Sequence, residues 1–332
     1  MGKTRCLGLA NYFSSLKSVI INIMLAKKGF VFIPIFLFVI LTSIAITVSY
    51  FAGIRSVHNE PIIQTLTQIN PTEDELSASS QQSDTNKNDV LGTTTIPTSN
   101  NLPTNGYSRQ KVATDRGIFT VSIIAADLNS ARVIADTASE SSCRNNCPVL
   151  SLKDYVTRSG AFAGINGPYF CPATYASCAG KTNAFDTLLM NKNKVYFNSD
   201  NNVYSTVPAA IYYGNTSRFV GQSLEWGRAT SVDSVIANYP LLVKDGNIRF
   251  TGSGEGKLNG KGNRAFIGSK DNYAYMGVVQ NATVAEVAVV LKAMGMKNAL
   301  NLDSGGSTAL WSGGYKFGPG RGIPTAILFA RK

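Results

Sequence analysis

The sequence predicts an α+β fold, with a mixed β-sheet core and flanking helices, preceded by one transmembrane helix and a disordered stalk. Three observations support this prediction. Short apolar runs bounded by glycine and asparagine turns recur through the C-terminal part and are typical of strands. Two segments among them have helical apolar spacing and an N-cap signal. Ahead of them, an uncharged apolar stretch is followed by a segment too polar to form a core.

The N-terminal part is predicted to be a membrane anchor. Residues 1–30 form a basic cytoplasmic segment without any acidic residue, and residues 31–52 contain no charged residue. About 20 apolar residues suffice to cross a bilayer as a helix, and a basic flank favours the cytoplasmic side. We therefore expect a single-pass protein of the cell membrane with an extracytoplasmic C-terminal domain. A cleaved signal peptide is the alternative, although its apolar region is usually shorter, about 7–15 residues.

Residues 53–109 are predicted to be a flexible stalk. They are rich in Ser, Thr, Asn and Gln, and Pro61, Pro71, Pro97 and Pro103 interrupt any regular element. Such a segment would hold the following domain away from the membrane.

The remaining residues, 110–332, are sufficient for one domain with its own core. Positions 109–332 contain 24 Lys and Arg against 14 Asp and Glu, a balance of +10 out of the total net charge of +11. A basic domain outside the cytoplasm suits an anionic partner such as a phosphate-bearing surface polymer. A charge without a specific partner is the alternative, and nucleic acid is not expected as a partner.

Four of the five cysteines lie in this domain: Cys143, Cys147, Cys171 and Cys178. Outside the cytoplasm they are better explained by two disulfides than by a metal site. Three pairings are possible, and we favour the local one, in which Cys143 pairs with Cys147 and Cys171 with Cys178. A zinc site would require a different spacing and a reducing compartment.

Capping signals predict two helices in the domain. Thr283 and Glu286 form a capping box ahead of a helix that Gly295 ends, and Ser151 is the N-cap of a shorter helix that ends at Gly160. The apolar runs predict strands at 118–128, 132–135, 161–165, 194–197, 209–213, 241–243 and 298–302.

Polar residues follow two of the predicted strands. Asp303 follows the strand at 298–302, and after Ser304 comes a Gly305-Gly306 turn whose backbone can approach a ligand closely. Asn166 follows the strand at 161–165 in the same way. We expect Asn166 and Asp303 to lie at the ends of neighbouring strands and to face one cleft, as at the ligand-binding edge of open α/β sheets.

Two arginines follow glycine-rich loops. Arg264 begins a predicted strand, and Arg321 lies in a Gly/Pro loop before the last strand. A guanidinium in such a position can bind a phosphate group through two parallel hydrogen bonds. A surface ion pair is the alternative for both arginines.

The residue types of the domain limit its chemistry. The only histidine, His58, lies in the predicted stalk, so the domain has no histidine base, no Ser-His-Asp triad and no histidine-containing metal site. Ser307 is therefore expected to cap the turn or to bind a ligand. The remaining groups suit a sugar linked through phosphate, because the departing phosphate is stable as an anion and needs no general acid. Asp303 would act as a base, as a nucleophile or as a ligand of a divalent cation.

Four blocks in this order resemble the signature blocks of the phosphodiester glycosidase family. They are G-I-N-G-P-Y-F at 164–170, N-R-A-F-I-G at 263–268, N-L-D-S-G-G-S-T at 301–308 and G-R-G-I-P-T-A-I at 320–327. The predicted anchor and stalk lie outside the resemblance. The usual family patterns are A-I-N-G-G-F-F and D-G-G-G-S-T, so Pro168 and Ser304 replace glycines here and Tyr169 replaces a phenylalanine.

The resemblance implies a mixed α+β fold, hydrolysis of sugar-1-phosphate diesters and, in bacteria, a role in exopolysaccharide or wall-polymer metabolism. Carried over by position, the site residues are Asn166, Tyr169, Phe170, Arg264, Asp303, Ser304, Gly305, Gly306, Ser307 and Arg321. Asp303 would be the main catalytic carboxylate. Arg264 and Arg321 would hold the phosphate, and Asn166 would orient sugar or water. The two aromatic residues would stack on the sugar ring, with core packing as the alternative for Phe170.

The sequence thus predicts an outward-facing enzyme that hydrolyses a sugar-1-phosphate diester of envelope or extracellular polysaccharide. A non-catalytic envelope protein that binds anionic glycans or takes part in polymer assembly is the alternative. In both cases the expected partner is a phosphate-containing glycan, with membrane contact through residues 31–52. No cofactor is certain, and a divalent cation is possible.

Overall fold

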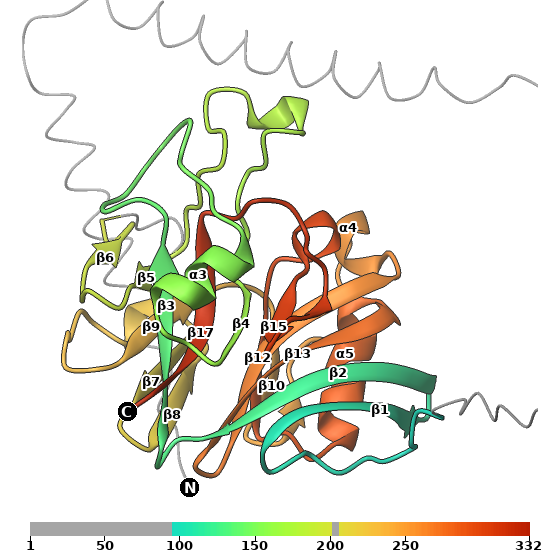
Figure 1. Ribbon diagram of the computed structural model, residues 1–332. Helices are drawn as coiled ribbons and strands as arrows, with labels where there is room; N and C mark the ends of the chain where they lie inside the picture. The colour runs from blue at the N-terminus through green and yellow to red at the C-terminus, as the bar shows by residue number, and fades with distance from the viewer. Residues whose placement is uncertain (1–94, 201–205) are drawn as a thin grey trace, which may run out of the picture. The chain divides into compact units, whose positions relative to one another are not determined.

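The computed structural model describes residues 95–200 and 206–332, which are mostly β-sheet with few helices (Figure 1). These residues belong to one compact unit, Asn88–Lys332. Within them, no helix is long and apolar enough to cross a membrane. The predicted basic segment 1–30 and membrane segment 31–52 lie outside the described residues.

A seven-stranded antiparallel sheet contains the first and the longest strands. In spatial order its strands are β1 (Gly106–Thr114), β2 (Gly117–Asp127), β13 (Tyr273–Ala282), β12 (Gly262–Lys270), β14 (Asn298–Asn301), β10 (Leu241–Lys244) and β11 (Asn247–Ile248). All of its strand pairs are antiparallel.

Two five-stranded antiparallel sheets complete the described part of the domain. The first has the order β16 (Tyr315–Phe317), β15 (Leu310–Ser312), β4 (Ala163–Asn166), β17 (Thr325–Arg331) and β3 (Ala131–Thr137). The second has the order β6 (Tyr196–Phe197), β5 (Leu189–Met190), β9 (Ser234–Ala237), β7 (Ala209–Tyr213) and β8 (Thr216–Val220).

The few helices lie against the sheets. They are α3 (Leu152–Arg158), α4 (Gly256–Asn259) and α5 (Val284–Ala293), with 3₁₀ turns at Ala176–Cys178, Ser223–Glu225 and Gly305–Ser307. Helix α5 packs on the seven-stranded sheet, and α3 packs on β4 and β17 (Figure 1). The predicted capping box of α5 is confirmed, because the backbone N–H of Thr283 donates to the Glu286 carboxylate at 2.7 Å and the backbone N–H of Glu286 donates to Thr283 Oγ1 at 3.1 Å.

Alternating side chains place the core between the three sheets. On β2, Ile124 points into this central core, while its neighbours Ile123 and Ala125 point to the face that α5 covers. On β17, Phe329 points into the central core and Leu328 towards α3. Both faces of these strands are therefore buried, which explains why their sequences read as continuous apolar runs.

The first strand was not predicted from the sequence. β1 starts at Gly106, inside the segment 53–109 predicted as stalk, while the first predicted strand, 118–128, corresponds to β2. Pro97 O accepts the backbone N–H of Lys111 at 2.8 Å, and the buried side chain of Gln110 donates to Ser99 O at 2.8 Å. β1 is an edge strand with mostly polar and partly exposed side chains, so it lacks the apolar run that marks the other strands.

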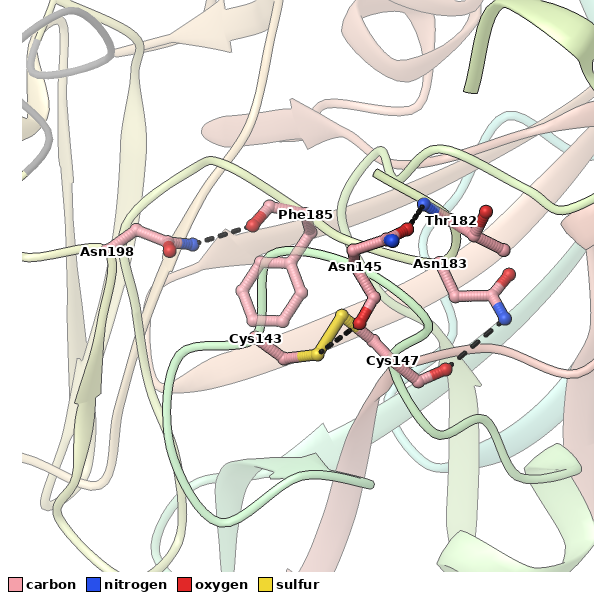
Figure 2. The surroundings of a disulfide bond; sticks show 7 residues. All are labelled: Cys143, Asn145, Cys147, Thr182, Asn183, Phe185 and Asn198. Atoms are coloured by element: carbon pink, nitrogen blue, oxygen red, sulfur yellow. Dashed lines mark hydrogen bonds between the residues drawn. A yellow bond between two sulfur atoms is a disulfide. The ribbon is translucent and has the colours of Figure 1, made fainter. Parts of the chain in front are cut away.

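The predicted local disulfides, Cys143–Cys147 and Cys171–Cys178, are both present. The first closes a loop that holds a neighbouring segment (Figure 2): Asn145 Oδ1 accepts the N–H of Thr182 at 2.8 Å, and Cys147 O accepts from Asn183 Nδ2 at 3.3 Å. The N–H of Asn183 also donates to Cys171 O at 2.6 Å. The segment at 182–183 thus connects both disulfide loops.

Phe329 provides a test of the central core. Replacing this fully buried side chain with alanine should lower the free energy of unfolding by about 3–5 kcal/mol, because it removes apolar contacts and leaves a cavity. Ile118, which is 66% exposed, is the matched control, and Ile118→Ala should change the stability by less than about 0.5 kcal/mol. Equal effects of the two substitutions in chemical denaturation would contradict this description of the core.

Candidate active site

A cavity of about 390 Å³ lies where β12 begins and β14 ends, beside the loop that follows β4. Seven of the residues predicted for the site line it: Tyr169, Phe170, Arg264, Asp303, Ser304, Gly305 and Ser307. The structure therefore brings together residues from three segments that are far apart in the sequence. Asn166, Gly306 and Arg321 are not lining residues of this cavity, and they contact the residues that are.

Asp303 is the carboxylate of this cavity closest to the sheet core. It is partly buried, and Leu302 before it is fully buried at the end of β14. Its Oδ1 accepts the backbone N–H of Ser304 at 2.9 Å, and the side chain of Ser307 hydrogen-bonds the carboxylate as well. Burial raises the pKa of Asp303 from its usual 3.8 to about 6, although Ser307, Ser304 and the positive charge of Arg321 oppose the shift. The carboxylate therefore changes its protonation state near pH 6 and is ionised at neutral pH.

Asn166 fixes the position of Asp303 from the neighbouring sheet. Its fully buried side chain donates from Nδ2 to the backbone oxygen of Asp303 at 2.7 Å, and its Oδ1 accepts the N–H of Ala309 at 3.2 Å. The expectation that the two residues end neighbouring strands is wrong, since β4 and β14 belong to different antiparallel sheets. Because both polar atoms of its side chain bond to the main chain, Asn166 stabilises the loop of Asp303 and does not line the cavity.

Arg264 lies on β12 and lines the cavity, but most of its donors are already in use. Its Nε donates to Ala282 O at 3.1 Å, and its Nη2 donates to the carbonyls of Lys257, at 2.9 Å, and Gly260. A fork of two parallel bonds through Nε and Nη2 is thus not open to a phosphate. Only Nη1 has no bond within the described residues, so Arg264 offers its charge and this one nitrogen.

Arg321 packs against the turn that follows Asp303. Its backbone N–H donates to Gly306 O at 2.9 Å, and a Cβ built on Gly306 would lie 2.2 Å from Arg321 Nη2. Gly305 has a φ of +67°, in the left-handed region that favours glycine. Glycine is therefore favoured at the two positions for different reasons: the backbone conformation at 305 and the space for the Arg321 guanidinium at 306.

The loop closed by the Cys171–Cys178 disulfide forms a wall of the cavity and holds Arg321. Thr174 Oγ1 in this loop accepts from Arg321 Nη1 at 3.1 Å. The ring of Tyr175 has the Arg321 guanidinium 5.4 Å from its centroid and the Lys257 ammonium at 5.8 Å. Because a ring face attracts cations, Tyr175 stabilises two positive charges near one another at the rim.

The two predicted aromatic residues have different environments. The Tyr169 hydroxyl accepts from Asn301 Nδ2 at 2.5 Å, and its ring packs against Tyr239 with the centroids 5.1 Å apart. Burial and the nearby charge of Asp303 raise the pKa of Tyr169 well above its usual value, so the hydroxyl stays protonated. Phe170 lines the cavity but also packs against two apolar clusters, in agreement with the alternative of core packing.

The model of the phosphodiester glycosidase family matches residues 159–330, which contain all ten predicted site residues. The chain belongs to the phosphodiester glycosidase family. Members of this family are hydrolases. The resemblance predicted from the four sequence blocks is therefore confirmed.

A solved structure with a TM-score above 0.5 shares the fold of this domain. The chain is similar to the zebrafish N-acetylglucosamine-1-phosphodiester alpha-N-acetylglucosaminidase catalytic domain auto-inhibited by its pro-peptide, with a TM-score of 0.53, 14% identity, and coverage of 71% of this chain and 87% of that chain. A hypothetical protein from Synechocystis gives a TM-score of 0.48, 12% identity, and coverage of 68% and 62%. A comparison with curated protein sequences found no match.

The departure from the usual family pattern at position 304 fits the local backbone. Ser304 has a φ of −141°, in the extended region that any residue adopts. Its Oγ accepts the N–H of Ala265 and donates to Leu302 O, both at 3.3 Å. In this family member the serine thus connects the loop of Asp303 to β12 without strain.

Six lining residues were not predicted from the sequence: Pro172, Tyr175, Tyr239, Glu255, Lys257 and Leu258. They come from the disulfide loop, the connection between β9 and β10 and the segment around α4, none of which resembles a motif. Glu255 gives the cavity a second carboxylate, and Lys257 adds a cation to that of Arg264. The sequence around these residues carries no signal that marks them as site residues.

No group of three or more His, Cys, Asp or Glu side chains that could hold a metal ion occurs in the described part of the chain. The cavity itself contributes two carboxylates, Asp303 and Glu255. The possible requirement for a divalent cation stays a prediction.

Asp303 should reduce stability at neutral pH. Because the folded-state pKa of Asp303 is raised, burial of its charge does not destabilise the folded protein below pH 3.8. The destabilisation is complete well above pH 6. Asp303→Asn should therefore increase the free energy of unfolding by up to about 3 kcal/mol at pH 8 and change it little at pH 4. Denaturation of both proteins across this pH range measures the difference. A pH-independent difference would rule out the raised pKa.

Proposed function

We propose that this protein hydrolyses a sugar-1-phosphate diester, breaking the bond between the anomeric carbon and the phosphate oxygen. The observation that carries the proposal is the placement of Asp303 in a cavity that Arg264 and Lys257 also line. A carboxylate with a pKa of about 6 is ionised at neutral pH yet basic enough to accept a proton. The positive charges of Arg264 and Lys257 would stabilise the negative charge of the phosphate.

In the proposed reaction, water provides both the new oxygen and the proton. Ionised Asp303 accepts a proton from water as the water oxygen bonds to the anomeric carbon. The electrons of the broken carbon–oxygen bond leave with the phosphate, which departs as a monoester. No histidine occurs in the domain, and none is needed, because a phosphate monoester is a stable anion without protonation. The products are a free sugar and a phosphate monoester.

The cations of the cavity fit the leaving group. Arg264 keeps Nη1 available, Lys257 lies at the rim beside Tyr175, and the charge of Arg321 acts on Asp303 across the Gly306 turn. Charge that develops on the leaving phosphate is stabilised most by groups already held in place, and hydrogen bonds hold the guanidinium groups of Arg264 and Arg321. Tyr175 and Tyr239 are exposed aromatic residues of the lining on which a sugar ring can stack.

The substrate proposed is a phosphate-linked envelope or extracellular polysaccharide. Two disulfides in the domain support a compartment outside the cytoplasm. Residues 31–52 would anchor the protein in the cell membrane, with the domain on the outer side. The net charge of the chain, +11, suits an anionic polymer.

The first experiment uses the purified full-length chain in detergent micelles and N-acetylglucosamine-1-phosphate esterified to p-nitrophenol. The proposal predicts free sugar and p-nitrophenyl phosphate, with oxygen from isotopically labelled water in the sugar. Asp303→Asn should lower kcat by about 10²–10⁴-fold, the usual contribution of a general base. Wild-type kcat/KM should rise with pH up to about 6 and then level off.

Controls separate this activity from other reactions. Asp245→Asn, on an exposed turn, removes the same charge and should leave kcat unchanged. Release of free p-nitrophenol together with sugar-1-phosphate would instead show phosphodiesterase chemistry and contradict the proposal. A parallel assay with a chelator decides the requirement for a divalent cation.

The Cys171–Cys178 loop should affect substrate binding more than chemistry. Cys171→Ser/Cys178→Ser, or Tyr175→Leu, should raise KM by about tenfold with a smaller change in kcat, because Arg321 and Lys257 lose their contacts with the loop. Tyr175→Phe keeps the ring and should behave as wild type. The double variant Cys143→Ser/Cys147→Ser, which opens the other disulfide, should lower stability without raising KM. A KM that rises equally in both disulfide variants would show a general loss of structure instead.

A non-catalytic glycan-binding role is the second proposal. The side chain of Arg264 favours this role, because its three hydrogen bonds go to main-chain carbonyls and leave few donors to stabilise a leaving phosphate. Retained binding of phosphate-rich glycans without turnover of sugar phosphodiesters would support this role over hydrolysis.

A further inference from the structure

A second cavity, of about 310 Å³, lies at the junction of the two five-stranded sheets. It shares no lining residue with the cavity of Asp303. Its walls come from β3, the C-terminal end of α3, the turn between β5 and β6, and the residue before β9. The charged residues that line it are Arg132, Arg158, Lys192, Lys194 and Asp233.

This second cavity has an excess of positive charge. Four cationic side chains line it together with one carboxylate, Asp233, and a second carboxylate, Asp136, lies behind the wall. Counting both carboxylates leaves a net charge of +2. That charge matches one phosphate dianion or two phosphodiester groups.

Asp136 holds two of the cations in fixed positions. Its carboxylate, which is only 4% exposed, accepts from Arg158 Nε and Nη2 at 2.8 Å each and from Lys192 Nζ at 2.9 Å. These bonds, with one from Ser159, hold the pKa of Asp136 below its usual range although burial acts to raise it. The Arg158 guanidinium also lies over the ring of Tyr155, 4.7 Å from its centroid. The two cations are thus ordered before any ligand arrives.

Both ordered cations keep donors for a ligand. Arg158 Nη1 has no hydrogen bond within the described residues, and Lys192 Nζ uses two of its three protons, on Asp136 and Ser159. The backbone N–H of Lys192 donates to Ala135 O at 2.7 Å, which fixes this turn to β3. A rigid wall with unused donors loses little entropy when an anion binds.

The other two cations are not needed to neutralise Asp136. Arg132 is exposed on β3, and its side chain makes no hydrogen bond or ion pair within residues 95–200 and 206–332. Lys194 reaches the cavity from a residue with a φ of +64°, and its Nζ donates to Val232 O. An ion-pair network that served only stability would be complete with Arg158 and Lys192. The two additional cations point to a ligand.

We propose that this cavity binds a phosphate group, either free or carried by a polyanionic chain, through Arg132, Arg158, Lys192 and Lys194. Arg132 and Arg158 precede residue 159, where the family match begins, so the site uses residues from outside that match. The site requires no turnover at Asp303. If the glycan is the substrate, the cavity holds a second phosphate of the same chain, and this last step rests on the proposed function.

The test is calorimetric titration of the full-length chain in detergent micelles with inorganic phosphate and with tripolyphosphate at low salt. Arg132→Gln/Lys194→Gln removes two of the four cations and leaves the Asp136 network intact. This variant should raise the Kd for tripolyphosphate by about tenfold or more, and added salt should weaken wild-type binding. Tighter binding of tripolyphosphate than of phosphate would indicate a polyanionic chain, and equal binding would indicate a single phosphate group.

Two matched variants make the outcome decisive. Arg116→Gln/Lys270→Gln removes the same charge from exposed positions outside both cavities and should bind as wild type. Arg264→Ala should retain this binding, because Arg264 belongs to the other cavity. An equal Kd in the Arg132/Lys194 variant and its control, or binding that only Arg264→Ala abolishes, would overturn the proposal. A ligand-dependent rise in Tm, absent only from the Arg132/Lys194 variant, gives a second readout that also shows whether each variant is folded.

Discussion

The buried amide of Asn166 is the contact on which the candidate active site depends. It bonds Asp303 O at 2.7 Å and the Ala309 N–H at 3.2 Å, so it joins the end of β4 to the loop after β14. The N–H of Asp303 returns a bond to Gly167 O at 3.2 Å. Leaving such an amide unpaired costs about 1–3 kcal/mol per group, so the loop has one favoured position. The catalytic carboxylate proposed here is therefore placed by two sheets together rather than by either alone.

Features that depend on neighbours in the sequence could be predicted without the structure. The Thr283 capping box and the pairings Cys143–Cys147 and Cys171–Cys178 each involve residues a few positions apart, and all are present. Asp303 and Arg264, which line the cavity, could be singled out because strand ends and glycine loops leave a local pattern. Strand β1 was missed, since an edge strand of mostly polar residues leaves no apolar run in the sequence.

Features that depend on distant residues could not be predicted. Strands β4 and β14 belong to different antiparallel sheets. Asn166 and Asp303 therefore meet in a contact between two sheets and not at the edge of one sheet, as the sequence had suggested. The three carbonyl partners of Arg264 lie 4 to 18 positions away, and nothing in its own segment shows that they would occupy its donors. Tyr175 enters the site only because a disulfide loop folds against Arg321. Such residues become visible only when their partners are placed in space.

The close contact of Gly306 with Arg321 has a consequence for the history of the site. A methyl group at 306 would lie 2.2 Å from Nη2 of an arginine fifteen positions later in the sequence. At 305 the turn favours glycine because φ is +67°. At 306 glycine is favoured by the neighbouring Arg321 guanidinium instead. We therefore expect the two positions to be coupled: relatives with a shorter side chain at 321 should accept alanine at 306. Covariation of this pair across the family would be the trace of that coupling.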